Sequence, residues 1–157
     1  MDLEIIPGRY AVCRLEPDSV QPIWARSPAG RELLSVTWSD SEMSVVCPEG
    51  RVPSGTASER GFTALRVRGA LDFDMTGVLA SLSVPLSEAG VPVFAISTHN
   101  TDYLLLRGDD LARGTAALAR AGHSIEAGDA DGEGQEAMRQ RGWATHPDPE
   151  PNLTGGA

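Results

Sequence analysis

The fold is decided by residues 62–125, FTALRVRGALDFDMTGVLASLSVPLSEAGVPVFAISTHNTDYLLLRGDDLARGTAALARAGHSI. Residues 62–67 alternate between apolar and polar side chains, which predicts a β-strand followed by a turn. Apolar side chains then recur at helical spacing over residues 75–89, so we expect a helix there, with Asp74 as its N-cap and Gly90 at its end. Pro85 lies inside this helix and is expected to kink it.

The rest of this stretch predicts a hairpin, a second helix and a closing strand. We expect a central strand over 91–97, a turn over 98–102, a returning strand over 103–107, a helix from Asp109 or Asp110 to Gly122, and a strand over 123–126. The order β-α-β-β-α-β is the ferredoxin-like arrangement, which places two helices on one face of an antiparallel sheet.

The first half of the chain repeats this order in reduced form. We expect a strand over 10–15, a short helix over 19–26 that Pro22 limits, and a hairpin of strands 33–38 and 43–47. The predicted fold class is therefore α+β, with two fused ferredoxin-like βαββ units built on antiparallel sheets. Their expected bounds are 1–60 for the reduced unit and 61–127 for the complete unit, followed by an acidic tail over 128–157 that is expected to be mobile.

Composition excludes several classes of function. The net charge is −9, the chain has no lysine, and its arginines are scattered, which disfavours nucleic acid as a partner. No apolar run approaches the ~20 residues of a membrane helix, and no secretory signal is present, so we expect a cytoplasmic protein. The histidines share no metal-ligand spacing, and Cys13 and Cys47 lie in apolar runs, so we expect buried thiols and neither metal nor cofactor.

One group of residues is suited to binding a small zwitterion. The start of the predicted helix offers free backbone amides at Thr76, Gly77 and Val78, which favour a carboxylate. Thr98 and Asp102 on the neighbouring turn offer oxygen acceptors for an ammonium group. The alternative interpretation is structural: a capping Asp74, an Asp102 that closes its turn, and a glycine that eases packing.

The stretch 62–125 resembles the C-terminal ACT unit of the CASTOR-type ACT family, in its TGVLASL, LSEAGV, TDYLLL and AGHSI segments. Residues 34–49, LSVTWSDSEMSVVCPE, resemble that family's hairpin with its E-x-S-V-V signature. The family includes small bacterial proteins and the arginine sensor of animals. The resemblance implies a bacterial sensor without catalytic residues, which binds an amino acid between two ACT units and forms a homodimer or higher homo-oligomer.

The resemblance also implies a set of ligand-binding residues. Ser44 and Val45 would line one wall, Gly77 and Val78 would supply amides, and Thr98, His99 and Asp102 would form the opposite loop. Met75 stands where the arginine sensor has a carboxylate, and His99 and Thr101 stand where it has aromatics, which favours a neutral or aromatic ligand over arginine. Two other interpretations stay open: an oligomerisation module with a vestigial pocket, and, more distantly, an enzyme acting through Asp74, Asp102 and His99.

Overall fold

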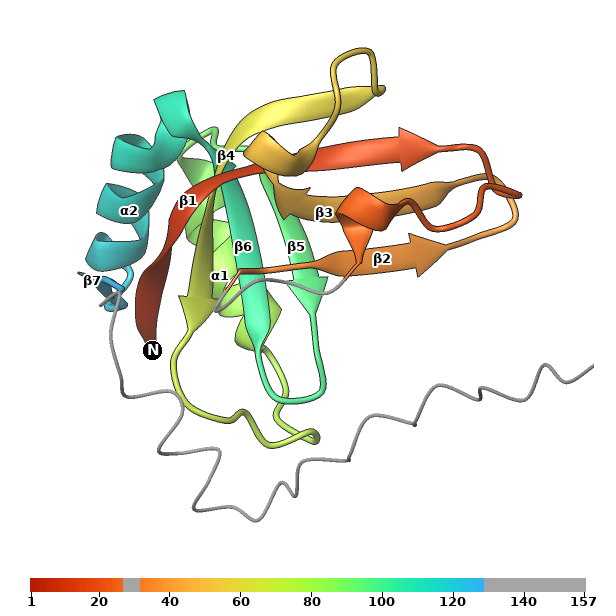
Figure 1. Ribbon diagram of the computed structural model, residues 1–157. Coiled ribbons are helices and arrows are strands. Elements are labelled where there is room, and N and C mark those ends of the chain that lie inside the picture. Colours follow the sequence, from red (N-terminus) through yellow and green to blue (C-terminus); the bar gives the residue numbers. More distant parts are fainter. Residues whose placement is uncertain (27–31, 129–157) are drawn as a thin grey trace, which may run out of the picture.

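The computed structural model describes residues 1–26 and 32–128. The described strands form one seven-stranded sheet, and both α-helices pack against it (Figure 1). The strands are β1 (Asp2–Leu15), β2 (Ser35–Trp38), β3 (Met43–Pro48), β4 (Ser58–Val67), β5 (Val93–Ser97), β6 (Asp102–Arg107) and β7 (Ser124–Ala127). The helices are α1 (Val78–Glu88), α2 (Leu111–Arg120) and the short 3-10 helices η1 (Ile23–Ala25), η2 (Glu49–Arg51) and η3 (Gly108–Asp110).

Strand β1 joins the two halves of the chain into one sheet, whose order is β2-β3-β1-β4-β6-β5. Its second part, Tyr10–Leu15, pairs with β3, and its first part, Asp2–Ile5, pairs in parallel with β7. The register with β4 shifts between Ile6 and Tyr10. Pro7 and Gly8 lie at this shift, where a missing N–H and a positive φ of 94° fit a bulge.

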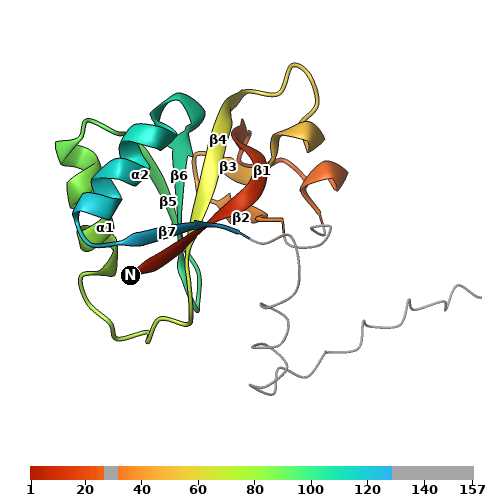
Figure 2. The ribbon, with the colours of Figure 1, turned by 90° about the vertical axis from the view of Figure 1, so that its left-hand side faces the viewer.

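Both α-helices cover one face of the sheet, as Figure 2 shows in side view. The buried residues between the helices and strands are Leu3, Leu65, Val67, Val78, Leu82, Leu86, Val91, Leu104, Leu106 and Leu118. Helix α2 comes close at Gly114, where a Cβ atom would lie 2.7 Å from Leu106 Cδ1 and 3.2 Å from Leu86 Cδ2. A glycine at this position therefore lets α2 reach α1 and β6 at short distance.

Strands β2 and β3 form one end of the sheet, and the 3-10 helices η1 and η2 lie on the side away from α1 and α2 (Figure 2). Their core contains Cys13 and Cys47, which are free and fully buried, as the sequence predicts. Cys13 pairs across the strands with Val45, and Cys47 with Ala11. None of the helices in the described ranges is long and apolar enough to cross a membrane.

The ferredoxin-like element order of the second half is confirmed from β4 to β7, but several details differ from the sequence prediction. The predicted helix over 19–26 is only the three-residue η1, so the first half has no α-helix among its described residues. The sheet is not wholly antiparallel, because β1 lies between β4 and β7 and pairs with β7 in parallel. The apolar β5 is an edge strand rather than a central one, and β1 begins eight residues earlier than predicted.

Helix α1 begins later than predicted, because Gly77, and not Asp74, is its N-cap. The helix runs through Pro85 to Glu88, and Gly90 follows its end with a φ of 65°. The expected mobile tail lies outside the described residues, apart from Gly128, whose amide donates to the carbonyl of Ile5 at 3.0 Å.

Candidate functional site

A cavity of about 360 Å³ lies at one end of the second half, between the β4–α1 loop and the β5–β6 turn. Both segments occupy the lower end of the molecule in Figure 1. The cavity is lined by Leu71, Asp72, Phe73, Met75, Gly77, Val78, Leu79, Ala80, Ser97, Thr98, His99, Asn100, Thr101 and Asp102. Its size falls in the range of small-molecule sites, and its lining combines apolar side chains with a few polar groups.

The β5–β6 turn is held in one shape by its own threonines. The Thr98 amide and the Thr98 hydroxyl both donate to the carbonyl of Thr101, at 2.9 and 2.8 Å. The Thr101 hydroxyl donates to the Val67 carbonyl at 2.7 Å, and the Leu71 amide donates to the Asn100 carbonyl at 2.8 Å. The last two bonds connect the turn to the end of β4 and to the β4–α1 loop, so the two walls of the cavity are fixed relative to each other.

Asp102 is the buried charge of this site. The residue is 8% exposed, and no hydrogen bond or ion pair to its carboxylate occurs among the described residues. Neither carboxylate oxygen is completely cut off from solvent, because the described residues include no fully buried side-chain oxygen without a partner. Asp102 is one of the residues that line the cavity. A buried carboxylate without a partner is costly, which makes it a strong acceptor for an incoming donor.

The start of α1 presents backbone donors to the same cavity. Gly77, the N-cap, has a φ of 80°, and no described side chain caps the helix. The Ser81 amide donates to the Gly77 carbonyl at 2.9 Å, so the preceding amides of the first turn have no intrahelical acceptor. These amides and the positive end of the helix dipole favour an anionic group. A Cβ at Gly77 would meet no described atom within 4 Å, so the backbone conformation, rather than crowding, requires glycine there.

Large apolar side chains surround the opening of the cavity. Phe73 is 83% exposed, Met75 50% and Leu79 39%. The Phe73 ring lies 5.9 Å from the His99 ring, measured between centroids, at an interplanar angle of 42°. His99 Nδ1 is 2.8 Å from Asn100 Oδ1, which orients the imidazole over the turn.

The structure brings together most of the residues that the sequence predicted for the site. Gly77, Val78, Thr98, His99 and Asp102 all line the cavity, and the exposed Thr76 precedes Gly77 without lining it. The sequence interpretation missed Phe73, an aromatic residue between Asp72 and Asp74 that has no periodic pattern to mark it.

The two residues predicted for the other wall lie elsewhere. Ser44 and Val45 belong to β3, and neither lines the cavity. Val45 is fully buried in the N-terminal core and pairs with Cys13, while Ser44 is half-buried and pairs with Arg14.

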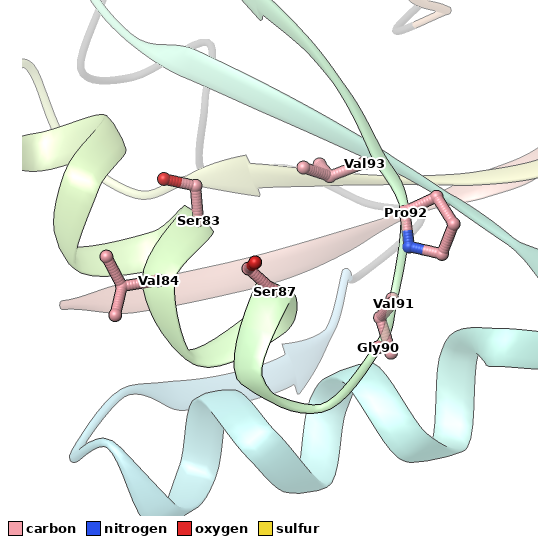
Figure 3. Close-up of a pocket in the computed structure, with 7 residues that line it drawn as sticks. All are labelled: Ser83, Val84, Ser87, Gly90, Val91, Pro92 and Val93. Carbon is pink, nitrogen blue, oxygen red and sulfur yellow. The ribbon is translucent and has the colours of Figure 1, made fainter.

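A second, wider groove of about 690 Å³ lies between α1 and the segment that leads into β5. Figure 3 shows Ser83, Val84 and Ser87 on the helix side and residues 90–93 on the other. The described lining of this groove contains no titratable side chain, so it offers neither a general base nor a metal ligand.

Neither thiol of the protein is suited to catalysis. Burial raises the pKa of Cys13, and burial together with the neighbouring Cys13 raises the pKa of Cys47 to about 12. Both thiols are therefore protonated and unreactive at neutral pH. No group of three histidine, cysteine, aspartate or glutamate side chains within residues 1–26 and 32–128 is placed to hold a metal ion.

Comparisons with known proteins agree with this arrangement of strands and helices. The family model described as an ACT domain matches residues 57–120, and the N-terminal domain model of another family matches residues 8–55. A protein from Agobacterium tumefaciens, known from its crystal structure, is 33% identical, with a TM-score of 0.75 over 84% of this chain and 96% of that one. Residues 57–120 of the chain form an ACT domain.

More distant structures share the fold of this ACT-domain protein. A Vibrio cholerae protein of unknown function is 15% identical over 76% of this chain and 88% of its own, with a TM-score of 0.61. The regulatory subunit of aspartate kinase from Thermus thermophilus is 10% identical over 76% of this chain and 96% of its own, with a TM-score of 0.53. The search of curated proteins gives no match.

Proposed function

We propose that this ACT-domain protein is a regulatory sensor that binds a free amino acid in the cavity between the β4–α1 loop and the β5–β6 turn. The proposal rests on Asp102, a residue that is 8% exposed, whose carboxylate has no partner among the described residues and which lines a cavity of ligand size. A protein retains such a group at a cost to its stability when a ligand satisfies it.

The two charged ends of an amino acid suit the two polar sides of the cavity. The α-ammonium group would donate to the Asp102 carboxylate, and the α-carboxylate would accept from the free amides at the start of α1. The connections from Thr101 to Val67 and from Leu71 to Asn100 hold these two sides in place before the ligand arrives. Such preorganisation lowers the entropy that binding would otherwise lose.

A regulatory rather than catalytic role is supported by the lack of an activated nucleophile among the described residues of the cavity and by the shared fold with an aspartate kinase regulatory subunit. The CASTOR-type resemblance adds a second ACT-like unit, over 1–60, to the ACT unit over 61–127. In that arrangement Ser44 and Val45 would contribute to a site between units. Because Val45 is buried within its own half, we assign the ligand contacts to the cavity residues alone.

We also propose that the protein acts as a homodimer, as the sequence resemblance implies. Strand β5 supports this, because it is an edge strand without charged residues, and Phe94 on it is partly exposed. Unprotected edge strands of this kind pair readily with a second copy. Light scattering after size-exclusion chromatography should give twice the monomer mass at micromolar concentration, and a monomer mass would contradict the dimer.

A thermal-shift screen of the full chain against the twenty amino acids tests the proposed function. A ligand that binds only the folded state raises the melting temperature according to about RT ln(1 + [L]/Kd). The amino acids that raise it are then titrated calorimetrically into the parent protein, the Asp102→Asn variant and an Asp109→Asn control. Asp109 is an exposed carboxylate beyond the other end of β6, so its loss removes the same charge without touching the cavity.

We expect Asp102→Asn to weaken binding about ten- to a hundredfold, the range of a charge-assisted hydrogen bond, and Asp109→Asn to leave affinity unchanged. If none of the amino acids binds the parent protein, the proposal is wrong, and the remaining interpretation is an oligomerisation module with a vestigial pocket. If an amino acid binds equally well to both variants, its site lies outside this cavity.

A further inference from the structure

The rim of the cavity is unusually apolar for a surface in contact with water. Phe73, Met75 and Leu79 all line the cavity and are all well exposed. Single exposed apolar side chains are common on protein surfaces. Three of them in the lining of one cavity, together with a buried aspartate, give the combination of apolar side chains and a few polar groups that is usual in a small-molecule site.

The charges of the lining limit which ligand side chains fit this wall. Among the described residues, the carboxylates that line the cavity are those of Asp72 and Asp102, and no arginine lines it. A ligand with an acidic side chain would therefore meet repulsion and no counter-charge. A basic side chain would find only Asp72, which is exposed, and ion pairs in water contribute little to affinity.

We infer that the ligand is an amino acid with an aromatic or large apolar side chain, such as phenylalanine, tyrosine, leucine or methionine, and that Phe73 determines this preference. The inference rests on the proposed function, because Asp102 and the start of α1 would hold the ammonium and carboxylate groups. The side chain of the ligand then lies against Phe73, Met75 and Leu79 and removes them from water. The Phe73 and His99 rings, 5.9 Å apart and tilted by 42°, offer both a ring face and a ring edge to an aromatic ligand.

Calorimetric titration of the full chain with L-phenylalanine, L-leucine, L-alanine, L-arginine and L-aspartate tests the preference. L-Phenylalanine and L-leucine should bind at least about tenfold more tightly than the other three, because their side chains bury more apolar surface against the rim. Phe73→Ala should reduce the affinity for L-phenylalanine about tenfold and leave the weak binding of L-alanine unchanged. Because Phe73 is 83% exposed, this variant should keep the melting temperature of the ligand-free parent.

Ile23→Ala is the matched control, because Ile23 is also an apolar side chain that is 83% exposed but lies in η1, outside the cavity lining. Its affinity for L-phenylalanine should equal that of the parent protein. Equal or tighter binding of L-alanine, L-arginine or L-aspartate would overturn the inferred preference while the proposed function stands. An unchanged affinity in Phe73→Ala would overturn the role of Phe73. The absence of binding by all five amino acids would overturn the preference, and the twenty-amino-acid screen then decides separately whether the proposed function stands.

Discussion

Replacing Asp102 by asparagine should make the ligand-free protein more stable while it weakens ligand binding. The carboxylate is 8% exposed and has no partner among the described residues, so its desolvation in the folded state is uncompensated. Asparagine has nearly the same shape, and its neutral amide is cheaper to bury than a charge. The substitution therefore removes the unfavourable desolvation of the carboxylate from the folded state. It also removes the charged acceptor to which the ligand would donate a hydrogen bond.

The expected increase in the free energy of unfolding of Asp102→Asn is limited by the incomplete burial of the carboxylate. A fully buried, unpaired charge would cost several kcal/mol, but the carboxylate oxygens of Asp102 keep some contact with solvent. We therefore expect a gain of about 1 kcal/mol in the free energy of unfolding. For a chain of this size, that gain corresponds to a rise in melting temperature of about 2–4 °C.

Urea denaturation and calorimetry of the ligand-free parent and of Asp102→Asn measure this difference, with Asp109→Asn as the control for a simple change in net charge. The control should shift the free energy of unfolding by less than about 0.5 kcal/mol, as expected of a surface substitution. A decrease of about 1 kcal/mol or more in Asp102→Asn would refute the reasoning, because it would mean that the carboxylate makes a stabilising interaction in the folded protein.

Two predictions concern stability away from the site. Leu82 is fully buried between α1 and the sheet, so Leu82→Ala should lower the free energy of unfolding by about 3 kcal/mol in urea denaturation, and a decrease below about 1 kcal/mol would contradict this packing. Burial raises the pKa of Cys47 from 9.0 to about 12, so the unfolded chain loses this proton first as pH rises. The stability that the neutral thiol contributes is complete below pH 9 and is lost between pH 9 and 12. Urea titrations at about pH 8 and pH 10 should show that the free energy of unfolding decreases with pH, by up to about 1.4 kcal/mol per pH unit for one thiol. The decrease should be smaller in Cys47→Ala. An equal decrease in the parent protein and in Cys47→Ala would contradict the prediction.

The second half of the fold was predictable because its patterns are local. The hairpin β5–β6 and the helix α2 follow from apolar runs, turn residues and helical spacing that neighbouring residues carry by themselves. The position of β1 between β4 and β7 is not a local property, since it depends on pairing between the two ends of the described chain. Pro7 and Gly8 also concealed the first part of β1, because their residue types indicate a turn, whereas the strand accommodates them at a change of register.

The position of β5 at the edge of the sheet was not predictable from its apolar sequence. A continuous apolar run such as VPVFAIS is typical of a strand buried on both sides, and this led to the prediction of a central strand. In the structure, β5 pairs only with β6 among the described strands, and Phe94 and Ala95 are exposed. Val93 and Ile96 pack against the buried clusters, whereas the exposure of Phe94 and Ala95 is consistent with the proposed homodimer.

The polar half of the site was predictable from turn chemistry, whereas the apolar half was not. Gly77 and Asp102 stand at a helix start and a hairpin turn, whose residue types the sequence marks clearly. Phe73 has no such mark, and only its position over His99 at the cavity opening reveals it. Ser44 and Val45 were predicted by family resemblance alone, and the structure places them in the N-terminal half.

The arrangement of the site explains why the chain retains two locally unfavourable features in one place. An unpaired carboxylate at the base of the cavity and exposed apolar side chains at its rim each lower the stability of the ligand-free protein. The turn and loop that carry them are held by hydrogen bonds from Thr101 and Leu71 to backbone carbonyls, so the cavity cannot collapse easily to relieve either cost. In the proposed function, an amino acid with an apolar side chain would relieve both at once, because its ammonium group would pair with Asp102 and its side chain would cover Phe73, Met75 and Leu79. A ligand would thus supply contacts that the ligand-free protein lacks, so binding would stabilise the folded protein, which is the property that a sensor requires.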